Sequence, residues 1–310
     1  MRLTPFDLPG RFWRGNLHCH SDRSDGALPP ERLLAFYRDA GFDFVALTDH
    51  FRPEFAYPLT DTRPWRTSGF TTLLGAELHA PRTTLASEWH IVAVGLPPDF
   101  APPAGGESAR QLARRARAAG AFVGMAHPAA SLLTEADAAS LDAAHAVEVY
   151  NALGAREDRA DSWHLCDLLL ARGRRLGAYA ADDAHFGPGD PPAATAWVQV
   201  RAASPDPADL LAALRAGHYY SSTGPALHDL HLDDAHAGPE AAITVRCSPA
   251  VQVTLTGAAP GLVHRTGEKI TECTLRLGRF AAGPFVRVTV VDGAGGRAWS
   301  NPIWLDHQPA

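Results

Sequence analysis

A regular alternation of short apolar runs with amphipathic segments, between about residues 14 and 220, constrains the fold of this 310-residue chain most. The apolar runs have the length and bounding residues of β-strands, whereas the segments between them carry apolar residues at helical spacing. Strands that alternate with helices predict parallel βαβ units, arranged as an open sheet or as a barrel. The strands are expected at Asn16–His18, Phe44–Thr48, Thr72–Glu77, His90–Gly95, Phe122–Ala126, Ala146–Tyr150, Leu176–Ala180 and Ala196–Val200. The helices are expected at Pro30–Ala40, Ser108–Ala119, Glu135–Leu141, Asp158–Ala171 and Pro207–Ala216.

The pattern changes after residue 225. From there the chain alternates apolar and polar residues in short segments such as AAITVRCS and FVRVTVVD, which Gly, Pro and Asp separate. This pattern predicts antiparallel strands in a sandwich-like module. We place the boundary near Gly224–Pro225, which divides the chain into a domain of residues 1–225 and a β-rich module of residues 226–310.

Charge and hydropathy exclude several classes of partner. The chain carries 28 basic and 34 acidic residues, so its net charge of −6 offers no basic field for a long nucleic acid. No stretch approaches the roughly 20 apolar residues that span a membrane. The first residues lack the apolar core of a secretory signal, so we expect a cytoplasmic protein without membrane contact. Four cysteines without a CxxC pair argue against a zinc ribbon.

The first candidate for chemistry is the sequence His18-Cys19-His20, at the end of a predicted strand. Residues i and i+2 of a strand point to the same face, so both imidazoles can approach one metal ion. Asp25, in the polar loop that follows, adds an oxygen ligand within reach of the same point.

The same construction recurs at the ends of later strands. In a parallel barrel the carboxyl ends of the strands meet on one face, where barrel enzymes place their sites. A carboxylate at the end of a buried run is costly unless it is paired or binds a metal. One ion takes four to six ligands, so a larger set indicates two or three ions that share carboxylates. The residues at these further ends are His50, Glu77, His90, His127, Asp183 and His185.

Residues near these strand ends are candidates for substrate binding. Asn151 ends the VEVYN strand on the same face, with capping of the next turn as the alternative role. Arg23 and Arg156 lie in loops after strand ends, where an arginine can grip a phosphate in a bidentate manner. Arg14 and Arg52 have comparable positions, and a solvated surface location is the competing interpretation for all four arginines.

The remaining histidines are assigned away from the site. His79 is left out, because by strand parity its side chain would point opposite to that of Glu77 only if that strand continues. We expect the others to lie on the surface of the first domain or in turns of the C-terminal module, which would supply no metal ligand; they include His145, His164, His218, His228, His231 and His236.

Six motifs occur in one order along the chain: HCHSDRSDG, ALTDH, GAEL, HIVAVG, AHP and DDAH. In these motifs, over residues 14–225, the chain resembles the PHP (polymerase and histidinol phosphatase) family. VEVYNA, and RAGHYYSSTGP before the β-rich tail, are similar to a metallohydrolase branch that includes carbaryl-hydrolase-like proteins. The resemblance implies a distorted (β/α)7 barrel that carries a two- or three-metal hydrolytic site.

Matched residue by residue, the resemblance implies that Glu77 bridges ions. A general acid for the leaving group would be a histidine near the metals, and His185 or His90 could serve. Many relatives have Ser-Asp-Ala-His where this chain has Asp182-Asp183-Ala184-His185, so Asp182 is an added acid that could support a ligand. The implied metal ligands are His18, His20, Asp25, His50, Glu77, His90, His127, Asp183 and His185.

These residues predict a hydrolase dependent on Mn, Fe or Zn that acts on a small phosphate ester or nucleotide through a metal-activated hydroxide. Nucleotide-cofactor, P-loop and serine-hydrolase motifs are absent from the sequence. Hydrolysis of a carbamate, amide or other ester at the same site is an alternative, and a non-catalytic metal-binding module is a further one.

Overall fold

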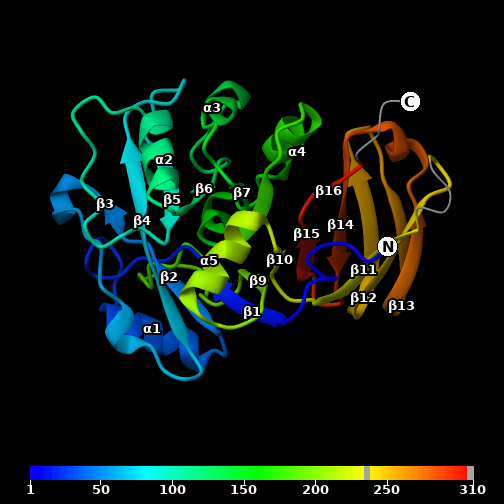
Figure 1. The fold of residues 1–310 in the computed structure, drawn as a ribbon, viewed down its shortest axis with the longest axis horizontal. Coiled ribbons are helices and arrows are strands. Elements are labelled where there is room, and N and C mark those ends of the chain that lie inside the picture. Colours follow the sequence, from blue (N-terminus) through cyan, green and yellow to red (C-terminus); the bar gives the residue numbers. More distant parts are fainter. Residues whose placement is uncertain (234–237, 306–310) are drawn as a thin grey trace.

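The structure is a computed structural model that describes residues 1–233 and 238–305. Within these residues, 16 strands form one mixed sheet with few helices, which confirms the predicted α/β class (Figure 1). The strands are β1 (Arg11–Asn16), β2 (Phe44–Leu47), β3 (His50–Phe51), β4 (Thr71–Ala80), β5 (Trp89–Val94), β6 (Phe122–Met125), β7 (Ala146–Asn151), β8 (Gly177–Ala181), β9 (Trp197–Ala202), β10 (Tyr219–Ser222), β11 (Leu227–Asp233), β12 (Ala242–Gly257), β13 (Val263–Arg276), β14 (Phe285–Val291), β15 (Arg297–Ser300) and β16 (Ile303–Trp304). The α-helices are α1 (Pro30–Asp39), α2 (Ala109–Ala118), α3 (Glu135–Ser140), α4 (Trp163–Ala171) and α5 (Pro207–Ala216).

Within residues 11–181 the strands run in the order β1-β2-β4-β5-β6-β7-β8, and β3 pairs with β4 outside this order. Neighbours are parallel, except that β5 is antiparallel to both β4 and β6. Beyond β8, the Asp183 amide donates to the His18 carbonyl and the His20 amide donates to the Ala184 carbonyl, each with an N···O distance of 2.9 Å. These bonds bring the residues after β8 beside the residues after β1, although about 165 positions separate them in sequence.

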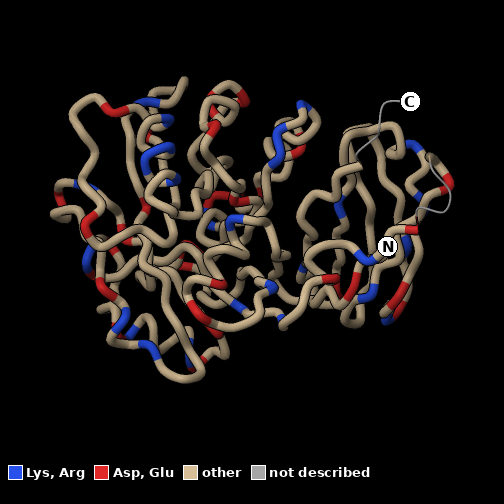
Figure 2. The backbone as a smooth tube through the Cα atoms, viewed as in Figure 1, with Lys and Arg blue, Asp and Glu red and all other residues tan. Residues whose placement is uncertain are grey.

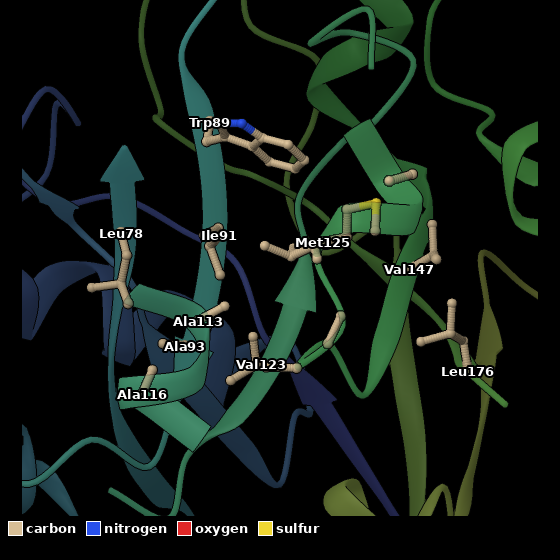
Figure 3. Packing of buried hydrophobic residues seen from close by; sticks show 14 of the residues in the cluster. Leu78, Trp89, Ile91, Ala93, Ala113, Ala116, Val123, Met125, Val147 and Leu176 are labelled. Carbon is tan, nitrogen blue, oxygen red and sulfur yellow. The ribbon is translucent and has the colours of Figure 1, made fainter. Parts of the chain in front are cut away.

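The side chains of β4 and β5 alternate between the two faces of the sheet, and the two faces have different surroundings. Leu78 and Ile91 point to the face that α2 covers, where fully buried Leu112 joins the same hydrophobic cluster (Figure 3). Val92 and Val94 belong to a second buried cluster on the opposite face. Because residues two apart share a face, Glu77 and His90 project on the side away from α2.

The C-terminal strands continue the same hydrogen-bonded network. β9 pairs antiparallel with β1, β10 pairs with β9, and β15 pairs with β10. The long strand β12 pairs with β11, β13 and β14, around a separate hydrophobic cluster that also contains Leu3 and Phe6. The first residues of the chain therefore pack with the C-terminal strands. Parts of the predicted module (residues 234–237, with His236, and residues 306–310) lie outside the described residues.

Two predicted boundaries are wrong, one because of a distant strand and the other because of the local backbone. The first strand spans Arg11–Asn16 rather than Asn16–His18, because its ladder to β9 starts at Arg11. The helix predicted from Asp158 begins at Trp163, because a 3-10 helix (Leu153–Glu157) precedes it and Asp158 has a left-handed φ of 58°. The other short 3-10 helices span Pro53–Phe55, Arg63–Trp65 and Gly278–Ala282.

Charged residues of both signs are interspersed along the chain (Figure 2). In the part of the chain that the structure describes, no helix has the length and apolar character needed to cross a membrane.

Candidate metal centre

The structure brings all nine predicted ligand residues together. They belong to four overlapping groups in which the candidate ligand atoms lie within 4.8 Å of one another. The groups are His20, Asp25, His50 and His185; His50, Glu77, His79 and His90; His18, His20 and Asp183; and His18, Glu77 and His127. Most of these side chains follow or end strands of the first domain, which places them at one end of the sheet.

Glu77, which is fully buried on β4, lies at the centre of the cluster. Its Oε1 atom is 2.8 Å from His90 Nδ1, 3.0 Å from His127 Nε2 and 3.6 Å from His18 Nε2. Its Oε2 atom is 2.6 Å from His50 Nδ1, 3.7 Å from His79 Nε2 and 3.8 Å from His20 Nε2. Each carboxylate oxygen therefore faces a different set of three imidazoles, as a bridging ligand requires.

Two aspartates complete the cluster from opposite sides. Buried Asp183 lies with Oδ1 3.0 Å from His20 Nε2 and 3.2 Å from His18 Nε2. Asp25 is the most exposed of the predicted ligands, and its oxygens lie 3.3 Å from the Nε2 atoms of both His50 and His185. Asp183 thus faces the buried interior, whereas Asp25 marks the solvent side of the cluster.

The second nitrogen of several imidazoles is held by the protein. His18 Nδ1 lies 3.0 Å from Glu148 Oε1, and His185 Nδ1 lies 2.9 Å from the Asp183 carbonyl. Because a carbonyl or carboxylate can only accept, these Nδ1 atoms carry a proton, and in the neutral ring Nε2 keeps the lone pair that can coordinate a metal. Metal-binding histidines commonly have such partners, which orient the ring and fix the tautomer.

Burial and the opposite charges within the cluster shift the pKa values of its side chains. Burial raises the pKa of Glu77, but the surrounding histidines, led by His90, outweigh it and hold this pKa well below the usual range. Burial lowers the pKa of His50, but the charges of Glu77 and Asp25 raise it to about 10. Burial lowers the pKa of His20 to about 3, so its imidazole is neutral at neutral pH and can coordinate.

The buried polar atoms test whether the residues fit metal ions. Among the described residues, His18 Nε2, both ring nitrogens of His20 and Glu77 Oε2 are buried without a hydrogen-bond partner. Buried polar atoms are normally satisfied, because each unsatisfied one costs about 1–3 kcal/mol. The unsatisfied atoms here point into the shared space of the cluster and are nitrogen and carboxylate donors, the types that Mn, Fe and Zn accept. The donor set therefore fits divalent transition-metal ions.

The predicted substrate-binding residues occupy different environments. Asn151 is buried, and its side-chain amide donates to Glu148 Oε2 and to Asp183 Oδ2, with an N···O distance of 3.1 Å in each case. Arg156 is half exposed and pairs with Asp190 at 2.6 Å, and Arg23 is exposed in the loop after His20.

Asp182 and Arg14 lie outside the cluster. Asp182 accepts hydrogen bonds from the Tyr37 hydroxyl and from the amides of Ala194, Thr195 and Ala196, so it anchors the segment before β9. The Arg14 guanidinium lies over the rings of Phe42 and Trp197, at 4.1 and 3.8 Å from their centroids.

Sequence reasoning missed two members of this region. The parity argument that left out His79 was wrong, because β4 continues to Ala80 and residues two apart on a strand share a face, so the His79 side chain lies on the side of Glu77. Glu148 was not singled out, although a charged residue inside the apolar run AVEVYN is an available signal. Its partners are known only from the fold, since they come from the ends of β1 and β6.

The fold and this cluster define an α/β protein with a histidine- and carboxylate-rich site able to hold metal. Comparison with protein-family models and with curated proteins finds no match. Among solved structures, the chain is similar to a two-domain protein from Bacteroides vulgatus that contains a predicted PHP-like metal-dependent phosphoesterase. The TM-score is 0.51 at 17% identity, over 96% of this chain and 98% of that one. This similarity confirms, at the level of the fold, the resemblance to the PHP family.

Two further similar structures each match 56% of this chain at 17% identity. One is a candidate metal-dependent phosphoesterase from Bifidobacterium adolescentis, with a TM-score of 0.42 over 89% of its length. The other is an amidohydrolase from Chromobacterium violaceum, determined with bound sulfate and no metal, with a TM-score of 0.45 over 88% of its length.

Proposed function

We propose that this chain is a metal-dependent hydrolase that cleaves a small phosphate ester or a nucleotide. The observation that carries the proposal is Glu77, a buried carboxylate with three imidazoles within 4 Å of each of its oxygens. When bound, two or three Mn, Fe or Zn ions would supply a nucleophilic hydroxide at neutral pH and neutralise charge that develops on phosphoryl oxygens.

The ligands would be the nine residues of the prediction. Glu77 would be shared between ions, because its two oxygens face different groups of histidines. Asp183 would bind on the buried side with His18 and His20, while Asp25 would bind on the exposed side with His50 and His185.

We propose His185 or His90 as the proton donor to the leaving group; the histidine that donates would not coordinate an ion at the same time. Both side chains are partly exposed, at 17% for His185 and 22% for His90, so a substrate can reach them. The Asp183 carbonyl accepts from His185 Nδ1 and directs His185 Nε2 toward Asp25 at the mouth of the cluster.

Arg23 and Arg156 are proposed to bind an anionic part of the substrate from the loops around the cluster. Arg156 would have to exchange its partner Asp190 for the substrate. Asn151 would act by holding Asp183, since its amide is already donated to that carboxylate.

We further propose that β1, β2 and β4–β8 form a distorted (β/α)7 barrel. The bonds that join residues 183–184 to residues 18–20 support this closure. A hydrophobic cluster around β12 supports a sandwich-like module of residues 226–310, against which Leu3 and Phe6 of the proposed domain of residues 1–225 also pack. The carbaryl-hydrolase-like branch and a cytoplasmic location are part of the same proposal and rest on the sequence alone.

The test is an assay of the full chain, purified without chelator and loaded separately with Mn²⁺, Fe²⁺ or Zn²⁺. The substrates are an aryl phosphomonoester, a bis-aryl phosphodiester, a nucleotide and an aryl carbamate. We expect phosphoester hydrolysis that a chelator abolishes and that readdition of metal restores. Cleavage of the carbamate alone would overturn the phosphoesterase assignment. Tight metal binding without any hydrolysis would favour the non-catalytic module.

A further inference from the structure

His79 is a histidine of the cluster that lies outside the set implied by the family motifs. Strand register explains its position. His79 is the direct partner of His90 across the antiparallel pair β4–β5, and His50 is the direct partner of Glu77 across the parallel pair β3–β4. Since Glu77 and His79 are two residues apart, three adjacent strands present these four side chains on one face.

The side chains converge as the register requires. His79 Nε2 lies 2.9 Å from His50 Nδ1 and 3.7 Å from Glu77 Oε2, and its ring centroid is 4.5 Å from that of His90. The His79 side chain is 4% exposed. One ligand atom from each of the four residues lies within 4.8 Å of the others. Three imidazoles and one carboxylate form a donor set typical of Zn and of neighbouring transition metals.

The other nitrogen of His79 faces a charged pair. His79 Nδ1 lies 3.7 Å from Glu88 Oε2 and 3.2 Å from Arg52 Nη2, and Arg52 also contacts Glu88. In this structure the hydrogen bond at Nδ1 comes from Arg52, which can only donate, so Nε2 carries the proton of the neutral ring and donates to His50. If Nδ1 instead donates to Glu88, once their 3.7 Å separation shortens to hydrogen-bond distance, the Nε2 lone pair is free to coordinate, with the usual carboxylate support of a metal-binding histidine.

We propose that His79 coordinates a divalent transition-metal ion through Nε2, together with Glu77 and His90, at a position that His50 also faces. Coordination requires that Arg52 releases His79 Nδ1 and that Glu88 comes within hydrogen-bond distance to accept a hydrogen bond from it. The proposal rests on the metal centre of the proposed function but not on the reaction catalysed there, and it adds one ligand to the set that the sequence motifs predict.

The test compares metal binding by the wild-type chain, His79→Leu and His79→Asp. His79→Leu removes the ligand, whereas His79→Asp offers an oxygen in its place. We expect His79→Leu to lose about one ion per chain, or to bind one ion at least about 100-fold more weakly in competition with a chromophoric chelator, and His79→Asp to recover part of that loss. The matched control is His145→Gln, a half-buried histidine outside all four groups, which should keep the wild-type stoichiometry.

Wild-type stoichiometry and affinity in folded His79→Leu would overturn the proposal. If His79→Leu does not fold, cadmium NMR of the wild-type chain with nitrogen-labelled histidine decides. Coupling from one cadmium to the His79 and His90 nitrogens supports the ligand role, and absence of coupling to His79 refutes it. Normal metal binding and hydrolysis by His79→Leu would refute this inference but leave the proposed function intact. If the wild-type chain hydrolyses none of the substrates but His79→Leu loses metal, the proposed function would be refuted and this inference would stand.

Discussion

Glu77→Gln is the substitution that probes the centre of the site most directly. The amide keeps the volume of the side chain but removes its negative charge and its ability to bridge two cations. Six imidazoles lie within 3.8 Å of the Glu77 carboxylate, whereas Asp183 lies within 4 Å of four, so Glu77 has the larger set of partners. We expect the fold to persist, since the hydrophobic cluster around Leu78 and Ile91 lies on the opposite face of β4 and β5.

The magnitude follows from what a bridging carboxylate contributes. Loss of an outer hydrogen-bond partner of a metal ligand weakens binding by about 10–100-fold, so loss of charge on the ligand itself is expected to exceed about 100-fold, or about 3 kcal/mol. At metal concentrations that saturate the wild-type chain, the ion would therefore raise the melting temperature of Glu77→Gln much less than that of the wild-type chain. Metal activation contributes several kcal/mol to such reactions, so kcat should fall by about a thousand-fold or more.

The assay measures metal content, melting temperature and kcat on one preparation of each protein. Melting is recorded with and without added Mn²⁺, so that loss of metal stabilisation is separated from damage to the fold. We expect Glu77→Gln to melt like the metal-free wild-type chain and to respond weakly to the ion. Full metal content with near-normal kcat would refute the bridging role. A lower melting temperature in both metal-free and metal-loaded states, with normal activity per folded molecule, would indicate an ion pair that serves only the fold.

Three further predictions follow from particular contacts. Glu148→Gln should weaken metal binding by about 10–100-fold, because Glu148 orients His18 through Nδ1; unchanged affinity in a chelator competition would contradict this role. Leu112→Ala should lower the free energy of unfolding by about 2–5 kcal/mol in urea denaturation while leaving metal content unchanged, because Leu112 is fully buried on the helix side of the sheet; a loss of less than 1 kcal/mol would be inconsistent with that packing. Burial lowers the pKa of His145 from 6.5 to about 4, so the stability contributed by its neutral form is present above pH 6.5 and lost as the pH falls toward 4. The melting temperature of the metal-free wild-type chain should therefore fall more steeply over that interval than that of metal-free His145→Gln, and parallel curves would refute the assignment.

The sequence predicted local structure well where one segment determines it. The helix Pro207–Ala216 agrees at both ends, because Pro207 suits the first turn and Gly217 adopts the left-handed conformation that ends the helix. The start of the helix at Trp163 was not predicted, because the preceding turn depends on a left-handed Asp158 and on a 3-10 segment without a strong sequence signal. The first strand was placed too late for a different reason, since its extent is set by the ladder with β9.

Eight of the nine candidate ligands could be selected from sequence because each stands at or near the end of an apolar run, where a histidine or a carboxylate has few structural reasons to lie, and Asp25 follows in the polar loop after the first run. The resemblance to the PHP family implies the same set of nine. The structure brings those residues into one cluster. The tertiary structure alone decided which nitrogen of each ring faces the cluster, that Glu148 supports His18 from β7, and that His79 lies opposite His90. The physical reason is that strand period is a property of one segment, whereas register and ring orientation are set by hydrogen bonds between segments that are distant in sequence.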